Sequence, residues 1–426
     1  MRSTPLTDTK KDRRIISVSI MIMYAFWRFL LSATTFSISW LVYAGFLLVT
    51  AFLCCTLLVI GEIRVSLSAL VCFPYIMYVI FQYGFDFNFE ATSYWLDCLL
   101  LILIAANTVF PNTIHEKLLI ISGVIVVIGI FVQMLFPDFY YSNIASLFTN
   151  YSQIRYWGSQ MNYAGFTYQL GQSASVLIVA EGAMLYFCRK KMKPFWFFLM
   201  TALFVVSIFF TGKRMLSMLS IVVPLIVYYF SGNSFGKRAR RLSLLIVIIF
   251  LGLFVLISNI DYLASTNIGI FSRLSSTLEL LNRGEAIDAS REALVQTALD
   301  TFKSHPVFGI GAGKYMSVTG AETDVHNVYI QTLCESGIIG FTFFVVMILY
   351  YALKTISLIQ RSDSNNGYIQ FSLFIQLVFI FNSFTENGTR NLSEYFLYFI
   401  AVGICIYADM EANRVHYQSR GKAVTE

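Results

Sequence analysis

Long apolar runs set the main limit on what this chain can fold into. Runs of about twenty apolar residues, the length that a helix needs to cross a hydrocarbon core of roughly 30 Å, recur along the whole sequence. Of the 426 residues, 57% are hydrophobic and 13% are charged, whereas a soluble domain is about a quarter charged. The chain is therefore predicted to be an all-α polytopic membrane protein with a single membrane domain over residues 1–426.

The apolar runs predict about twelve transmembrane helices. The first follows a polar, basic N-terminal tail and lacks a small-residue cleavage site, so we expect it to be retained as a helix. The segments lie near 15–33, 36–60, 65–83, 94–110, 118–136, 166–188, 195–211, 215–231, 242–260, 328–353, 368–384 and 392–409.

The charges of the connecting loops alternate along the chain. One set of connections, which includes both tails, holds most of the Lys and Arg residues. The short loops of the other set carry only Arg155, Lys213, Arg214 and Arg390. The positive-inside rule places the basic set and both termini in the cytoplasm, so the loops 137–165 and 261–327 face outward. The net charge of +6 is explained by this topology and does not indicate nucleic-acid binding.

The outward loop 261–327 is too long for a plain connection, and loops of this length usually carry function. Within it, the segment 291–303 has an apolar face, as a membrane-surface helix would. Asp288 or Ser290 can cap its start, and His305-Pro306 can end it. Arg291 falls in its first turn, where the helix N-terminus and a guanidinium together suit a phosphate or diphosphate. A solvated surface arginine is the alternative.

Two further outward arginines are candidates for binding. Arg214 lies in the turn Thr211-Gly212-Lys213-Arg214, where cations run against the charge rule; snorkelling to lipid headgroups explains it equally well. Arg155 lies in the stretch RYWGSQMNYAGF, whose aromatic residues suit a sugar-stacking platform or, more commonly, an interfacial belt.

His326 stands at the start of the tenth apolar run. At helical spacing it would share a face with Gly337 and Gly340, small residues that let another helix approach closely. An imidazole at a membrane surface suits a general base acting on a hydroxyl. A packed or capping histidine is the alternative.

Several kinds of chemistry have no sequence signal. No phosphate-binding loop or dinucleotide fingerprint is present, and Asp324-x-His326 is too sparse to predict a metal site, so no cofactor or metal is expected. The seven cysteines lie in apolar runs without a C-x-x-C pair, which favours buried thiols. An outward site also has no access to cytoplasmic nucleotides, so its substrate must arrive activated, as a lipid-linked diphosphate does.

Four motifs together resemble one known family. The pattern His326-Asn327, nine residues and then Gly337-Ile-Ile-Gly340 looks like the signature of the O-antigen ligase and polymerase superfamily. The stretches HPVFGIGAGKY, FTGKRMLSML and RYWGSQMNYAGF resemble the segments that this family places around its outward site. The number of spans and the large loop before the tenth span are also similar to that family.

The resemblance implies a glycosyltransferase with a multi-helix, GT-C-like membrane core in the bacterial inner membrane, with its active site facing the periplasm. It implies a donor and an acceptor that are oligosaccharides linked to undecaprenyl diphosphate, and a chain-length regulator is considered as a further partner. It implies that His326 is the catalytic base, that Arg214 and Arg291 bind the diphosphate, and that Arg155 contributes to the same binding.

Three functions stay open at this point. The first is a polysaccharide polymerase for O-antigen, capsule or exopolysaccharide, which transfers the glycan to the hydroxyl of a lipid-linked repeat unit, without metal and with inversion. The second is a ligase that uses the same donor and lipid A core or another acceptor. The third is a glycolipid flippase or transporter; against it, Arg28 and Asp97 are the only strong charged candidates within spans, and transport sites usually lie in broken helices near the midplane.

Overall fold

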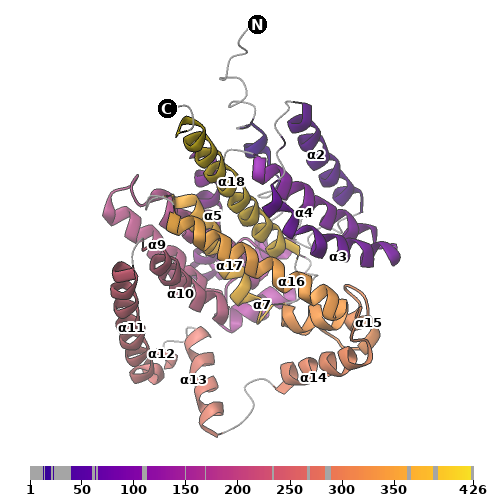
Figure 1. Ribbon diagram of the computed structural model, residues 1–426. Coiled ribbons are helices and arrows are strands. Elements are labelled where there is room, and N and C mark those ends of the chain that lie inside the picture. The colour runs from indigo at the N-terminus through magenta and orange to yellow at the C-terminus, as the bar shows by residue number, and fades with distance from the viewer. Residues whose placement is uncertain are drawn as a thin grey trace. The chain divides into compact units, whose positions relative to one another are not determined.

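Helices make up every regular element that the structure describes (Figure 1). The computed structural model describes residues 13, 15–20, 23, 40–59, 63, 66–107, 113–148, 150–167, 169–232, 235–265, 269–283, 289–361, 366–386 and 392–423. The all-α prediction is confirmed for these residues, and each predicted apolar segment from 36–60 onward coincides with a helix. Most of the first predicted segment, together with Arg28 and Asp288, lies outside the described residues.

Five of the described helices are long and apolar enough to cross a membrane, judged by length and composition. They are Leu67–Phe85, His115–Leu135, Leu170–Cys188, Val328–Arg361 and Tyr395–Arg414. Shorter apolar helices accompany them at Leu47–Val59, Ala91–Asn107, Pro194–Phe210, Arg214–Phe230 and Gly367–Asn382. The chain is thus a multi-helix membrane protein, while the number of twelve spans stays a prediction.

Exposed apolar side chains support the membrane assignment. Phe195 and Phe198 are 69% and 68% exposed, and Phe250 is 69% exposed. A soluble monomer rarely exposes large contiguous apolar patches, so helices with such faces are suited to lipid rather than water. All seven cysteines are free thiols, and all but Cys55 are buried.

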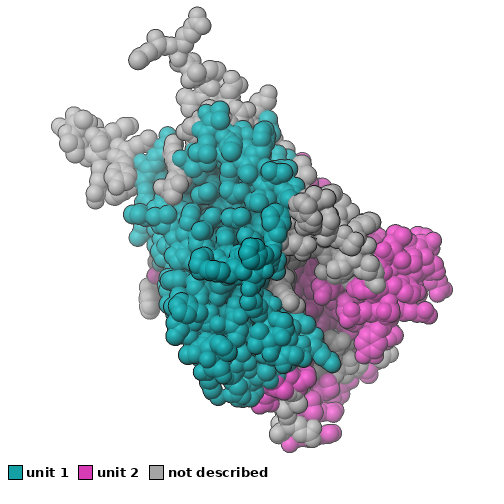
Figure 2. All heavy atoms as spheres, turned by 90° about the vertical axis from the view of Figure 1, so that its right-hand side faces the viewer, with its two compact units in different colours: residues 1–23, 39–115, 294–426 teal, residues 24–38, 116–293 magenta. Residues whose placement is uncertain are grey.

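The chain divides into two compact units (Figure 2). Unit 1 comprises residues 1–23, 39–115 and 294–426, and unit 2 comprises residues 24–38 and 116–293. The helix α14 (Ala289–Ser304) crosses the division. This division by internal contacts does not test whether residues 1–426 form a single membrane domain, which stays a prediction.

Unit 1 is made of helices, and aromatic side chains of α4 lie in its core. These helices are α2 (Trp40–Val59), η2 (Leu67–Val71), α3 (Phe73–Phe85), α4 (Phe89–Asn107), α15 (Tyr315–Thr319), α16 (Val328–Arg361), α17 (Gly367–Asn382) and α18 (Leu392–Ala423). Trp95 of α4 is fully buried, and its ring lies 5.8 Å from that of Tyr75 in α3 and 5.0 Å from that of Tyr395 in α18. A Cβ on Gly403 would lie 2.3 Å from the Cβ of Ala105, so small residues let α18 approach α4 closely.

Unit 2 is built around α8, whose described side chains are almost all buried. Its elements are α5 (Thr113–Leu135), which enters the unit at residue 116, α6 (Pro137–Asn143), η3 (Ala145–Leu147), α7 (Tyr151–Ser159), α8 (Leu170–Ala183), η4 (Met184–Cys188), α9 (Pro194–Phe210), α10 (Arg214–Phe230), α11 (Phe235–Ser258), α12 (Ile260–Ser265) and α13 (Gly269–Arg283). A Cβ on Gly123 of α5 would lie 2.3 Å from Ala180 of α8 and 2.9 Å from Phe204 of α9. The missing side chain therefore lets three helices meet at one point.

Candidate active site

His326 lies immediately before α16 rather than on its face. Its φ is 54°, a left-handed conformation that non-glycine residues adopt uncommonly, and its side chain is half-buried. The next residue, Asn327, caps the helix, because its Oδ1 accepts hydrogen bonds of 3.1 Å from the backbone N–H groups of Tyr329 and Ile330. The expectation that His326 continues the helical face of Gly337 is therefore wrong, since the chain turns at His326 before the helix begins.

The helix α16 is broken at Gly337, where φ is 62° and ψ is −170°. The preceding segment, residues 306–311, runs along the break and pairs with its backbone. Ile310 N donates to the carbonyl of Cys334 at 3.2 Å, and Gly311 N donates to that of Glu335 at 2.8 Å. On the other side of the break, Ile338 N donates to the carbonyl of Pro306 at 2.9 Å. The loop thus satisfies groups that a broken helix would otherwise leave unpaired.

Two glycines make this pairing sterically feasible. A Cβ on Gly337 would lie 2.3 Å from the carbonyl oxygen of Val307, and a Cβ on Gly309 would lie 2.3 Å from that of Glu335. Both glycines have positive φ, 62° and 70°. Gly337 therefore admits a backbone segment rather than the second helix that we expected, whereas Gly340 does face a helix, since its Cβ would lie 2.7 Å from Tyr78 of α3.

The side of α3 facing the break also holds the loop. Tyr78 Oη donates to the carbonyl oxygen of Ser336 at 2.9 Å, and Gln82 Nε2 donates to that of Phe308 at 3.1 Å. Lys314, at the end of the glycine-rich turn, forms an ion pair of 2.6 Å with Asp86 at the end of α3. The two motifs HPVFGIGAGKY and His326…Gly337 therefore form one joint in unit 1, the glycine joint (residues 306–315 on residues 334–339).

The helix α14 packs its apolar side on unit 1. Ala298 is fully buried in a cluster with Tyr315, Val325 and Cys334, and Leu294 packs against the same cluster. Tyr315 Oη donates to the carbonyl oxygen of Leu294 at 3.0 Å, and burial raises the pKa of this hydroxyl above its ordinary value. The predicted helix is confirmed and ends at Ser304, before His305, but this part of its apolar face is covered by protein rather than lying on a membrane surface.

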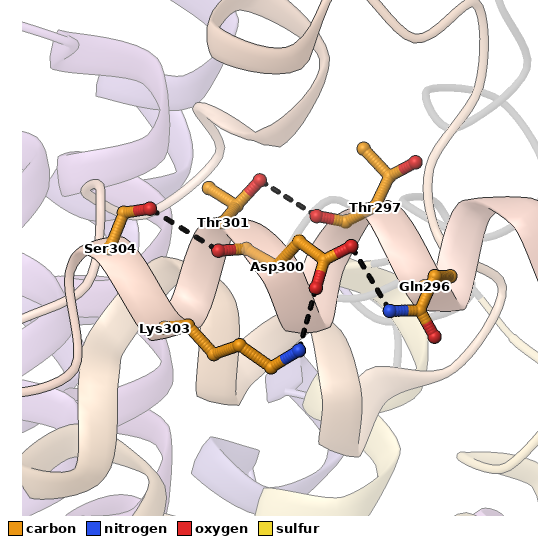
Figure 3. Close-up of polar contacts among 6 residues, drawn as sticks. All are labelled: Gln296, Thr297, Asp300, Thr301, Lys303 and Ser304. Atoms are coloured by element: carbon orange, nitrogen blue, oxygen red, sulfur yellow. Dashed lines mark hydrogen bonds and ion pairs between the residues drawn. The ribbon is translucent and has the colours of Figure 1, made fainter.

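The opposite side of α14 is polar and exposed (Figure 3). Asp300 accepts hydrogen bonds of 3.0 Å from Gln296 and 2.7 Å from Lys303. The Lys303 ammonium and the Gln296 amide lower the pKa of this exposed carboxyl. Arg291 lies in the first turn of the same helix, as predicted, and its side chain is half-buried.

Arg214 is the first residue of α10 in unit 2. Its Nη1 donates a hydrogen bond of 3.0 Å to the hydroxyl of Thr277 in α13. The turn before it depends on Gly212, whose φ is 68° and whose added Cβ would lie 1.8 Å from the Oδ1 of Asn162. The exposed guanidinium therefore stands at a helix N-terminus with a defined neighbour, which suits an anion but does not by itself identify one.

Lys213, noted above as an outward cation, belongs to this same turn, and Asn162, which carried no sequence signal, packs against it. A Cβ on Gly171, near the start of α8, would lie 3.3 Å from the Lys213 Nζ, so the ammonium lies close to a second helix N-terminus. Asn162 is fully buried, and neither polar atom of its amide has a hydrogen-bond partner among the described residues. No sequence pattern brings Asn162 to this turn; the fold of unit 2 does.

Arg155 lies on α7 and is exposed. The helix is fastened through Ile154, which is fully buried in a cluster with Tyr140 and Ala145. Gly165 closes this segment, since its N–H donates to Gln133 Oε1 at 2.9 Å and its carbonyl accepts from Tyr140 Oη. The loop 137–165 thus contains the packed helices α6, η3 and α7, and Arg155 is exposed on α7.

The fold and the positions of these residues indicate a class of protein. The chain is a helical membrane protein with cations at helix starts in unit 2 and a histidine at a helix start in unit 1. Among the residues that the structure describes, no group of three His, Cys, Asp or Glu side chains is placed to hold a metal ion.

Residues 197–345 match the family model described as O-antigen ligase. The match runs from α9 into α16 and includes Arg214, Arg291 and His326. It confirms the resemblance to the O-antigen ligase and polymerase superfamily, whose members are membrane enzymes of the glycosyltransferase type. A comparison with curated proteins finds no match.

Proposed function

We propose that this protein is an extracytoplasmic polysaccharide polymerase. It transfers a growing glycan from undecaprenyl diphosphate to a sugar hydroxyl of a lipid-linked repeat unit. The observation that carries the proposal is the family match, together with a His326 that is held by backbone geometry at the entrance of α16. The proposal places the protein in the bacterial inner membrane, with both termini in the cytoplasm and the site facing outward.

The proposed reaction is a displacement at the anomeric carbon. His326 takes the proton of the acceptor hydroxyl while its oxygen forms the new glycosidic bond. The bond from the anomeric carbon to the diphosphate breaks, undecaprenyl diphosphate leaves with the electron pair, and the anomeric configuration inverts. Arg214 and Arg291 bind the diphosphate and stabilise its developing negative charge. Arg155, which is exposed on α7, contributes to binding the same donor.

A ligase is the second candidate, since the family model that matches residues 197–345 is described as O-antigen ligase. The ligase would use the same donor and the same residues, with lipid A core or another acceptor in place of the repeat unit. The structure also bears on the transporter alternative. The broken helix of a transporter leaves backbone groups free for its cargo, whereas the glycine joint pairs the backbone groups of Cys334, Glu335 and Ile338 with the protein itself.

The test uses purified full-length protein in lipid nanodiscs with a fluorescent lipid-linked repeat unit. A polymerase produces a ladder of lengthened lipid-linked chains from this substrate alone. If chains do not lengthen and label appears on added lipid A core, the ligase replaces the polymerase. Entry of intact substrate into proteoliposomes without any new bond would reject both enzyme functions in favour of transport.

A further inference from the structure

The carboxylate of Glu335 is held inside the glycine joint. Its side chain lies in the last turn before the break of α16 and is fully buried. Oε2 accepts a hydrogen bond of 2.9 Å from Gly313 N, and Oε1 accepts one of 3.3 Å from Tyr315 N. Burying a carboxylate is costly unless hydrogen bonds compensate for lost water. Because these two donors are backbone groups of the glycine-rich turn, the carboxylate fastens that turn to α16.

A second side chain extends this contact toward His326. Gln331 lies one turn before Glu335 on α16, and its Nε2 donates hydrogen bonds of 3.0 Å both to Glu335 Oε1 and to Asp324 Oδ1. An amide NH₂ group has two donors, and each serves one carboxylate. Gln331 and Glu335 are fully buried and Asp324 is 7% exposed. The contacts therefore form a continuous chain that ends two residues before His326.

His326 is thus held between two fixed residues. On one side Asp324 is tied to Gln331, and on the other side Asn327 caps α16. Between them the backbone of His326 has a φ of 54°. A conformation of this kind is unfavourable for a non-glycine residue and persists only where its surroundings impose it. The chain from Glu335 through Gln331 to Asp324 is one of the surroundings that can impose it.

We infer that Glu335 is a positioning residue for His326. It fastens the glycine-rich turn to the break of α16 and, through Gln331 and Asp324, holds the backbone of His326 in its left-handed conformation. This inference rests on the proposed role of His326 as the base. Since its described donors are backbone and side-chain groups of the protein itself, Glu335 acts through His326 and not on the substrate.

The test is a double-mutant cycle with Glu335→Gln and His326→Ala in full-length protein supplied with lipid-linked donor and acceptor. In Glu335→Gln an amide N–H would oppose one of the donors that the carboxylate now accepts. The expected result is a fall in kcat of roughly 10–100-fold, the scale of a small misplacement of a reacting group, with the KM for donor changed less than about twofold. In the His326→Ala background the same change should cause no further loss of kcat.

A second pair of variants keeps the inference testable if Glu335→Gln does not fold. Gln331→Met preserves the approximate shape of the side chain and keeps the hydrogen bonds from Gly313 and Tyr315 to Glu335. It removes the hydrogen bond from Gln331 to Asp324. It should lower kcat in the same way, again without a further effect in the His326→Ala background. Glu322→Gln changes an exposed carboxyl of the same stretch and should leave kcat and KM unchanged.

The outcomes of these variants distinguish a failure of the positioning role of Glu335 from a failure of the base assignment of His326. If His326→Ala loses activity but Glu335→Gln and Gln331→Met both keep wild-type kcat, the positioning role fails while the proposed function stands. If the loss caused by Glu335→Gln persists undiminished in the His326→Ala background, Glu335 acts on general structure and the inference also fails. If His326→Ala itself keeps wild-type turnover, the base is another group and the mechanism fails together with this inference.

Discussion

At the scale of single residues, His326 meets two requirements at one position. Its backbone takes a left-handed turn before α16, and its imidazole is the group that we propose as the base. Histidine, asparagine and aspartate are the non-glycine residues that tolerate this backbone region best. A loss of activity on substitution could therefore come from the lost imidazole or from a displaced backbone, and a pair of substitutions separates the two causes.

We predict that His326→Ala and His326→Asn both lose turnover by roughly 10²–10⁴-fold, the usual contribution of a positioned general base. The asparagine variant should also keep the apparent melting temperature of the wild type, because it tolerates the same backbone conformation. Turnover from purified protein and thermal melting in detergent are the two measurements. Recovery of turnover in His326→Asn would assign the histidine a backbone role only.

The arginines allow a prediction of the same kind. Arg214→Lys and Arg291→Lys keep the positive charge but lose the planar fork that grips a diphosphate at two points. Each should lower kcat/KM for the lipid-linked donor at least about tenfold, as loss of a group that stabilises developing charge does. Arg283→Lys, at an exposed position with an ion pair of 3.8 Å to Glu279, is the matched control. Equal behaviour of the three variants would remove the diphosphate assignment.

At the scale of elements, the glycine joint is the feature on which the candidate site depends. The glycine-rich turn and the break of α16 are separate in sequence, yet each leaves space for the backbone of the other at Gly309 and Gly337. A continuous helix would have no backbone groups to offer the turn. The break thus converts the start of a membrane helix into a docking point for the loop that precedes it.

We therefore predict that Gly309→Ala and Gly337→Ala each destabilise the protein. Their φ values of 70° and 62° alone cost an alanine about 1–3 kcal/mol, and the added Cβ would also displace a backbone carbonyl. Both variants should melt at lower temperature and lose activity together. Gly84→Ala is the control, because nothing lies within 4 Å of its added Cβ. A wild-type melting temperature for Gly337→Ala would mean that the joint does not form as described.

At the scale of the whole molecule, the residues that the sequence predicts for binding and catalysis belong to different units. Arg155, Arg214 and Arg291 belong to unit 2, and His326 belongs to unit 1. The matching family segment, residues 197–345, also includes residues of both. The roles proposed for all four residues require that their loops face outward, so they depend on the orientation of the protein in the membrane.

A reporter that is active only outside the cytoplasm tests this orientation. Fused after Thr319, at the end of α15, it should be active, because the loop 261–327 is predicted to face outward. Fusions after Lys193 and after Arg238 should be silent, since these residues belong to the basic set of connections. The reverse pattern would place His326 and the arginines in the cytoplasm, where the proposed outward reaction cannot occur.

The sequence by itself determined the class of the molecule and the position of its helices. Apolar runs of membrane-spanning length leave few other folds, and this is why a helix lies at each predicted run from 36–60 onward. The local stop at His305-Pro306 likewise ended α14 as expected, because a proline cannot continue the hydrogen-bond pattern of a helix. The motif around His326 also indicated the resemblance that the family match over residues 197–345 confirms.

Tertiary structure alone decided how those motifs meet. Periodicity placed His326 on the face of a continuous helix, whereas the chain turns before α16 and the helix breaks at Gly337. Glu335 and Gln331 carried no sequence signal. Their role depends on the hydrogen-bond partners that the fold packs around them, and no local pattern reports those partners. Local patterns report the preferences of one segment, while the pairing of a loop backbone with a broken helix depends on two segments at once.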